Sequence, residues 1–282
     1  MIIKGRNTHS FVCSDTAANR LVWIDEYGNI MKEKGGMSAV FDIWILQNKN
    51  ILFSQYGGDS GDGVCILKED GTVAFQYNTK GEVFSCQPLE NGNILVGELR
   101  QKRLVEVTPE GKIAVEIPIE YEGNPHECMR MVRKVGDYYY VVQPGLNKIR
   151  KVTQKGEIIK EYHIHEDAFG VVLRDNGNLI YTCMSGAYEL NQNGDEIWSL
   201  TEKDVPEMNI RWLLGVQLLS NGNLVFSNWM GHGHRDEGIH FFEVTPDKQI
   251  VWFYDGRGIL KEPATLQILD EDSDRVCYFP MK

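Results

Sequence analysis

The chain has 282 residues, of which 42% are apolar and 24% charged, a balance that supplies a full core and excludes a disordered chain. Its 29 lysines and arginines stand against 40 acidic residues, for a net charge of −11. That charge repels phosphate backbones and anionic headgroups, which excludes general nucleic-acid binding. No apolar run approaches the roughly 20 residues that span a bilayer, so we expect no membrane insertion.

The first ten residues, Met1 to Ser10, lack the apolar stretch of a secretory signal peptide. We therefore expect a soluble protein that is cytoplasmic, or exported if a signal has been removed. The six cysteines form no Cys-x-x-Cys pair, and most lie in apolar strand-like runs such as Phe11-Val12-Cys13. These features predict reduced, buried thiols rather than a disulfide framework.

The predicted elements begin with an outer hairpin, in which residues 21–24 lead through Tyr27-Gly28 into residues 29–31. An inner hairpin follows at 41–53, where two apolar segments flank Asn48-Lys49-Asn50. Asn-Gly tolerates the positive φ angles of a two-residue hairpin turn, so related segments predict further hairpins. Three have an Asn-Gly-Asn turn and two are degenerate: 84–96 around Asn91-Gly92-Asn93, 169–181 around Asn176-Gly177-Asn178, 214–226 around Asn221-Gly222-Asn223, 129–141 at Gly136-Asp137, and 265–279 at Asp272-Ser273-Asp274.

A second hairpin follows each inner one. These outer hairpins occupy residues 63–77, 104–115, 148–162, 188–200 and 241–254, and the sixth is the N-terminal copy. Two hairpins make a four-stranded antiparallel sheet, and successive turns lie 41 to 45 residues apart from Asn48 to Asn221. This period is typical of propeller blades. The predicted fold is therefore all-β, a single six-bladed β-propeller domain over residues 1–282.

The two ends of the chain are predicted to share one blade. The last inner hairpin is C-terminal and its matching outer hairpin is N-terminal, so pairing them closes the ring and removes its free sheet edges. Both Phe11-Val12-Cys13 and the segment Arg275 to Phe279 have the pattern of the second strand of that blade. The sequence leaves open which of them fills it.

The repeated turn and the Asp/Glu-x-Gly-x-Ile outer hairpin resemble six-bladed propellers of the arylsulfotransferase-like and quinoprotein-like kind, including bacterial surface-layer and PQQ-like proteins. The resemblance covers nearly the whole chain, but the repeated residues are turn and core residues, so it specifies architecture rather than function. It implies sulfuryl transfer through a channel histidine, for which His126 and His165 are candidates, with Arg130, Arg211 and Arg235 as anion clamps. The acidic residues nearby oppose a sulfate ester.

Aligning the six repeats on their turns predicts a ligand site at the mouth of the central channel. Acids, a histidine and a tryptophan occupy equivalent positions there, and amides and a tryptophan lie deeper. The mouth residues are Ala39, Glu82, His126, Asp167, Trp212 and Glu262, and the deeper ones include Trp44, Gln87, Gln217 and Gln267. This polar-aromatic set predicts binding of a carbohydrate or another small molecule. We expect the protein to be a monomer. The alternative is a solvent-filled channel mouth, in which polar residues are tolerated and no ligand is bound.

One glycine-rich loop, residues 228–238, is longer than its counterparts and carries Trp229, His232 and His234. His-x-His with a carboxylate suits a divalent metal such as Zn²⁺ or Mn²⁺. A metal there predicts an enzyme, a metal-assisted hydrolase, lyase or lactonase. Without one, the loop is a lid that brings Trp229 over a ligand, or a solvated surface loop.

Overall fold

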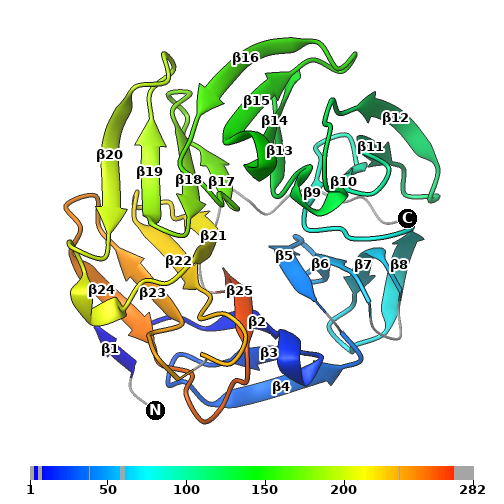
Figure 1. The fold of residues 1–282 in the computed structure, drawn as a ribbon. Helices are drawn as coiled ribbons and strands as arrows, with labels where there is room; N and C mark the ends of the chain where they lie inside the picture. The colour runs from blue at the N-terminus through cyan, green and yellow to red at the C-terminus, as the bar shows by residue number, and fades with distance from the viewer. Residues whose placement is uncertain (1–2, 6–7, 38, 58–60, 235, 270–282) are drawn as a thin grey trace. The chain divides into compact units, whose positions relative to one another are not determined.

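A computed structural model describes residues 3–5, 8–37, 39–57, 61–234 and 236–269 of the chain. Strands dominate it, and within the described residues they form six antiparallel sheets (Figure 1). The prediction of an all-β, six-bladed β-propeller with four-stranded blades is confirmed. None of the helices in the described ranges is long and apolar enough to cross a membrane.

The described residues fall into two compact units, 3–37 with 168–269 and 39–167. The second unit holds three blades and two short 3-10 helices, η2 (Pro125–Glu127) and η3 (Pro144–Leu146). Its strands are β5 (Val40–Ile45), β6 (Ile51–Gln55), β7 (Gly63–Leu67) and β8 (Val73–Asn78); β9 (Cys86–Pro88), β10 (Ile94–Glu98), β11 (Arg103–Val107) and β12 (Ile113–Pro118); and β13 (Val132–Val135), β14 (Tyr138–Gln143), β15 (Lys148–Val152) and β16 (Ile158–His163).

The first unit also holds three blades, with the 3-10 helices η1 (Thr16–Ala18) and η4 (Pro206–Met208). A short strand, β1 (Ile3–Gly5), extends one blade by pairing with β24. The blades are β17 (Val171–Leu173), β18 (Leu179–Cys183), β19 (Gly186–Leu190) and β20 (Glu196–Thr201); β21 (Leu213–Leu218), β22 (Leu224–Asn228), β23 (Phe241–Val244) and β24 (Ile250–Tyr254); and β25 (Pro263–Ile268), β2 (Phe11–Asp15), β3 (Arg20–Ile24) and β4 (Ile30–Gly35).

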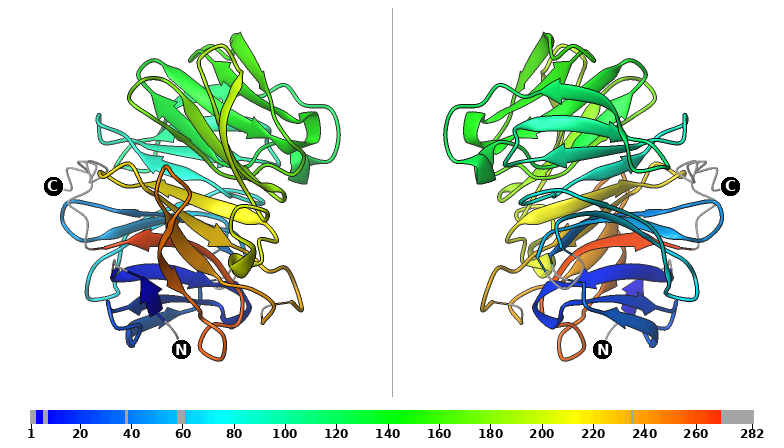
Figure 2. Two further views of the ribbon diagram at one scale, coloured as in Figure 1. Left: turned by 90° about the vertical axis from the view of Figure 1, so that its left-hand side faces the viewer. Right: turned by 90° about the vertical axis from the view of Figure 1, so that its right-hand side faces the viewer.

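The blade shared by the two ends of the chain has the strand order β25-β2-β3-β4. In both views of Figure 2, β25 in orange-red lies beside the blue N-terminal strands, and Phe11 pairs with Ile268 and Cys13 with Leu266. The predicted pairing of N- and C-terminal strands is confirmed, and the second strand is β2. The inner partner of β25 is therefore β2 rather than the return strand of a 265–279 hairpin. Residues 270–282, which include that predicted turn, lie outside the described residues.

The Asn-Gly-Asn turns differ from the predicted two-residue type. In the turn after β9, Leu89 accepts from the amide of Gly92 at 2.9 Å and donates to the carbonyl of Asn93 at 2.8 Å. Only the glycine has a positive φ, 85°, as in a three-residue loop with a glycine bulge. Asn91 contributes its side chain instead, because its Oδ1 accepts from the amide of Asn93 at 3.1 Å.

The last asparagine of each Asn-Gly-Asn turn joins two strands of its own blade. Its side-chain amide donates to a glutamate on the third strand, which explains why an acid tolerates burial there. The three pairs are Asn93–Glu106 at 3.5 Å, Asn178–Glu189 at 2.9 Å and Asn223–Glu243 at 2.6 Å. The repeat therefore encodes a polar contact within the blade as well as a turn.

The core lies between neighbouring blades of each unit, where apolar residues of the middle strands interdigitate. In the first unit, one cluster contains Phe226 and Phe242 and another contains Phe11, Phe241 and Trp252. In the second unit, Leu52, Ile66 and Val96 belong to a third cluster. This packing sets the blades of each unit against one another and positions the loops at the blade ends.

Five cysteines in the described part of the chain are free and buried: Cys13, Cys65, Cys86, Cys128 and Cys183. Burial raises the pKa of the Cys128 thiol to about 11 and raises the pKa values of Cys13 and Cys86 well above the ordinary range.

Because thiolate is the reactive form, we expect a disulfide reagent to label at most one of the six thiols within minutes in native buffer, and all six in denaturant. Rapid labelling of four or more would contradict this burial.

Candidate functional site

One group of predicted residues meets in the first unit, and we call it the tryptophan–glutamate cluster: Trp212, Trp229, His232 and Glu262. The rings of the two tryptophans lie 5.6 Å apart at an interplanar angle of 60°. Trp229 Nε1 donates to Glu262 Oε1 at 3.3 Å, and His232 Nδ1 lies 2.8 Å from the same oxygen. The His232 ring stands edge-on to Trp229 at 5.1 Å. Trp229 and His232 thus both contact one carboxylate, and Trp212 packs against Trp229.

The position of Glu262 is set by the end of strand β2. Asp15 is fully buried, and its Oδ1 accepts from the backbone amides of Lys261 and Glu262 at 2.9 and 2.8 Å. The hydroxyl and amide of Thr16 donate to the Glu262 carbonyl at 2.8 and 3.0 Å. The Glu262 side chain is only 13% exposed. The loop between β24 and β25 is therefore anchored at this residue.

The two tryptophans are held by the last residue of strand β22. Asn228 is fully buried, its Oδ1 accepts from the amide of Arg211 at 3.0 Å, and its amide group donates to the carbonyl of Ile239 at 2.9 Å. The amide of Trp229 donates to the carbonyl of Trp212 at 2.8 Å. These bonds fix both ends of the glycine-rich loop and bring the two indoles together.

Within that loop, the predicted metal ligands contact different carboxylates. His232 lies against Glu262, whereas His234 Nδ1 is 2.7 Å from Glu237 Oε1. Arg211 also pairs with Glu237, at 3.3 Å, on the exposed side of the loop. Over the described ranges, no three His, Cys, Asp or Glu side chains are grouped so as to hold a metal ion.

In the other unit, three predicted residues meet beside Phe84, which was not predicted as a site residue. We call the four residues the imidazole–carboxylate cluster: Glu82, Phe84, His126 and Arg130. His126 Nδ1 lies 2.7 Å from Glu82 Oε1. The Arg130 guanidinium lies 4.8 Å from the centre of the Phe84 ring, and the His126 ring meets Phe84 edge-on at 5.5 Å. Arg130 is only 6% exposed and donates to the carbonyl of His126. Burial lowers the pKa of Arg130, and the nearby carboxylates of Glu82 and Asp167 act in the opposite direction.

Of the other predicted mouth residues, His165 and Asp167 are exposed in the loop between β16 and β17. Asp167 has a positive φ of 55°, and its charge acts on Arg130 in the same unit. Glu82, His126 and Asp167 belong to the unit of residues 39–167, while Trp212, Trp229 and Glu262 belong to the other. A single site that gathers all of them stays a prediction.

The predicted deeper residues contact neighbouring strands of their own units. Gln87 exchanges two hydrogen bonds with the backbone of Lys134, at 2.7 and 3.1 Å. Gln217 accepts from the amide of Ile268 at 3.0 Å, and Gln267 donates to the carbonyl of the same residue at 3.2 Å. The indole of Trp44 donates to the carbonyl of Cys86 at 2.7 Å. Gln87, Gln217 and Trp44 thus link adjacent blades through hydrogen bonds to the backbone, while the buried Nε2 of Gln217 has no hydrogen-bond partner among the described residues.

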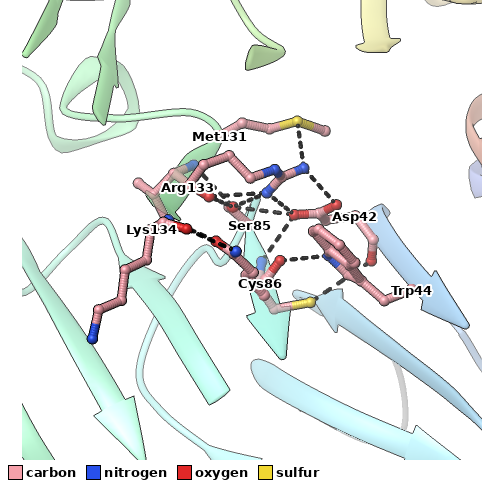
Figure 3. Close-up of polar contacts among 9 residues, drawn as sticks. Asp42, Trp44, Ser85, Cys86, Met131, Arg133 and Lys134 are labelled. Atoms are coloured by element: carbon pink, nitrogen blue, oxygen red, sulfur yellow. Dashed lines mark hydrogen bonds and ion pairs between the residues drawn. The ribbon is translucent and has the colours of Figure 1, made fainter. Parts of the chain in front are cut away.

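Sequence reasoning missed a buried ion pair on the inner strands of the second unit (Figure 3). Arg133 donates to both carboxylate oxygens of Asp42, at 2.8 and 3.1 Å, and its guanidinium lies 5.0 Å from the Trp44 ring centre. Asp42 also accepts from Ser85 Oγ and from the amide of Cys86, each at 3.1 Å. The available signal was Asp42 inside the apolar run Phe41-Asp42-Ile43 and Arg133 directly after Val132 in the strand Val132–Val135.

The chain matches no family model and no curated protein, so the finer arylsulfotransferase-like, surface-layer or PQQ-like resemblance stays a prediction. Among solved structures, a protein of unknown function from Bacteroides caccae is 18% identical, with a TM-score of 0.82 over 94% of this chain and 100% of that one. A catalytically inactive virginiamycin B lyase from Staphylococcus aureus with quinupristin is 17% identical, with a TM-score of 0.62 over 93% and 91%.

The WD40 propeller domain of Doa1 is 13% identical, with a TM-score of 0.60 over 88% of this chain and 75% of that one. Identities this low carry fold but not activity. This chain shares with these three proteins the β-propeller fold.

Proposed function

We propose that the protein binds a neutral small molecule that carries a sugar-like ring, and that the tryptophan–glutamate cluster holds it. The observation that carries the proposal is the meeting of two half-exposed indoles with an anchored carboxylate, Trp229 Nε1 lying 3.3 Å from Glu262 Oε1. Indoles present a broad apolar face at a small entropic cost, and a carboxylate accepts from hydroxyl groups.

The composition of the cluster favours a carbohydrate over an anion. Glu262 supplies a negative charge, and the chain as a whole carries −11, so a phosphate or sulfate group would be repelled. A sugar ring has apolar C–H faces for Trp212 and Trp229 and hydroxyl donors for the Glu262 carboxylate. His232, with an 84% exposed side chain, stands beside the carboxylate as a further polar contact.

Metal-assisted hydrolase, lyase or lactonase chemistry is the alternative function. Its support is the carboxylate within 2.8 Å of His232 Nδ1 and the presence of virginiamycin B lyase among the structural neighbours. The contacts of His234 with a different carboxylate favour the binding function.

The proposal is tested by titrating the protein with a panel of neutral mono- and oligosaccharides and following tryptophan fluorescence. We expect a saturable change with at least one sugar, and a loss of affinity of about tenfold or more in Trp229→Ala, because the indole supplies both ring surface and a bond to Glu262.

The matched control is Trp23→Ala. Trp23 is also half-exposed, but it lies in β3 with the Lys32 ammonium 4.8 Å from its ring centre, away from the cluster residues. This variant should bind as the unaltered protein does. Equal losses in the two variants, or no saturable change with any sugar of the panel, would reject the proposed site.

A further inference from the structure

The backbone of His126 is held on both sides. It lies in the middle of η2, where Asn124 accepts from its amide at 3.1 Å and a proline occupies the first helical position. Arg130 donates to its carbonyl from the C-terminal side. Because both backbone groups are bonded, the imidazole projects from a defined point of the loop between β12 and β13.

The ring of His126 has one engaged nitrogen and one accessible nitrogen. Nδ1 lies 2.7 Å from Glu82 Oε1, so the carboxylate favours the tautomer that carries its proton on Nδ1. Nε2 makes no hydrogen bond with the described residues, and the side chain is 46% exposed. A carboxylate that orients an imidazole and leaves Nε2 with a free lone pair is the arrangement of a general base.

An aromatic surface adjoins this pair. Phe41 and Tyr56 stack with ring centres 6.0 Å apart, and both pack edge-on against Phe84, at 5.0 and 5.5 Å. Phe84 is buried, whereas Phe41 and Tyr56 are half-exposed. Burial, reinforced by the charge of Glu82, raises the pKa of the Tyr56 phenol, so this surface is uncharged at neutral pH.

The charges around the pair select against an anionic substrate. Glu82 lies beside the imidazole, and Glu127 is exposed one residue further along η2. Arg130, a cation of the imidazole–carboxylate cluster, is buried and donates to backbone carbonyls. A neutral molecule with an aromatic or alicyclic ring fits this combination of an apolar surface and acidic surroundings.

We propose that Glu82 and His126 form an acid–base pair that hydrolyses neutral, ring-bearing esters or lactones, with the ring packed on Phe41 and Tyr56. His126 Nε2 takes a proton from a water molecule, whose oxygen bonds to the acyl carbon. The bond from that carbon to the leaving oxygen breaks, and the imidazolium returns its proton to that oxygen, so one water is added overall. Glu82 stabilises the imidazolium. A positioned general base contributes about 10²–10⁴-fold in rate.

The test is hydrolysis of p-nitrophenyl acetate and of the aromatic lactone dihydrocoumarin by the whole chain. We expect His126→Gln to lose at least tenfold in rate. Glu82→Gln should also be slower, because the imidazolium loses its anionic partner. The control His163→Gln, at an exposed histidine at the end of β16, should retain the full rate with both substrates.

A second readout does not depend on turnover: the ¹H–¹⁵N correlation of the His126 ring at pH 8 should show the proton on Nδ1. The inference fails if the proton is on Nε2, if His126→Gln hydrolyses as fast as the unaltered protein, or if the protein is no faster than an equal concentration of imidazole. The cluster shares no residue with the proposed sugar site, so Trp229→Ala should leave hydrolysis unchanged, and the two proposals fail independently.

Discussion

Replacing Asp42 by alanine is expected to lower the free energy of unfolding by about 3–5 kcal/mol, because it leaves the charge of Arg133 buried without its carboxylate. Arg133 is 7% exposed and Asp42 is 3% exposed. The substitution also removes the acceptor for Ser85 and for the amide of Cys86. Urea denaturation followed by tryptophan fluorescence measures the change.

Removing both charges should lower the free energy of unfolding much less than removing one. In the double variant Asp42→Leu/Arg133→Met no charge remains to be desolvated, and we expect at least half of the lost stability to return. Asp175→Ala, at an exposed turn position, is the control and should shift stability by no more than about 0.5 kcal/mol. If the double variant were as unstable as Asp42→Ala, the burial of an unpaired charge would not be the cause.

Replacing Asp15 by alanine is expected to lower the free energy of unfolding by about 3 kcal/mol, because a fully buried carboxylate is removed together with two backbone hydrogen bonds and its ion pair with Arg20. Its Oδ2 lies within 3.0 Å of the Arg20 guanidinium, and its Oδ1 holds the amides of Lys261 and Glu262. The same change releases the segment that carries Glu262, so sugar binding at the tryptophan–glutamate cluster should weaken as well. Denaturation and the fluorescence titration measure the two effects.

Asp15→Asn separates charge from geometry at this position. Its amide oxygen can still accept from the two backbone amides, while the ion pair with Arg20 is lost. We expect stability between that of the unaltered protein and Asp15→Ala, with sugar affinity nearer to that of the unaltered protein. Loss of affinity to the same extent in both variants would show that the charge, and not the anchored loop, determines binding.

The fold could be predicted because its determinants are local and repeated. Each blade carries an alternating apolar pattern and a glycine turn, and the spacing of those turns counts the blades. The three-residue loop with a glycine bulge could not be predicted from the sequence, because Asn-Gly occurs in both this loop and the two-residue turn. Only the backbone pairing of Leu89 with Asn93 distinguishes the two. The choice of β2 as the second strand of the shared blade likewise depends on which of two similar segments pairs with β25.

The sequence predicted which residue types occupy the candidate site, but only partly which of those residues lie together. The register of the repeats identified Glu82, His126, Trp212 and Glu262 as equivalent loop residues, but which side chains touch depends on contacts between residues far apart in the chain. His232 contacts Glu262 and not His234, and Asp42 contacts Arg133 across 91 positions. The sequence by itself therefore determined the blades, their number and the shared terminal blade, through short-range patterning. Tertiary structure decided which buried charges pair between blades, because a charge buried by packing needs an opposite charge or donor that residues far apart in the chain supply.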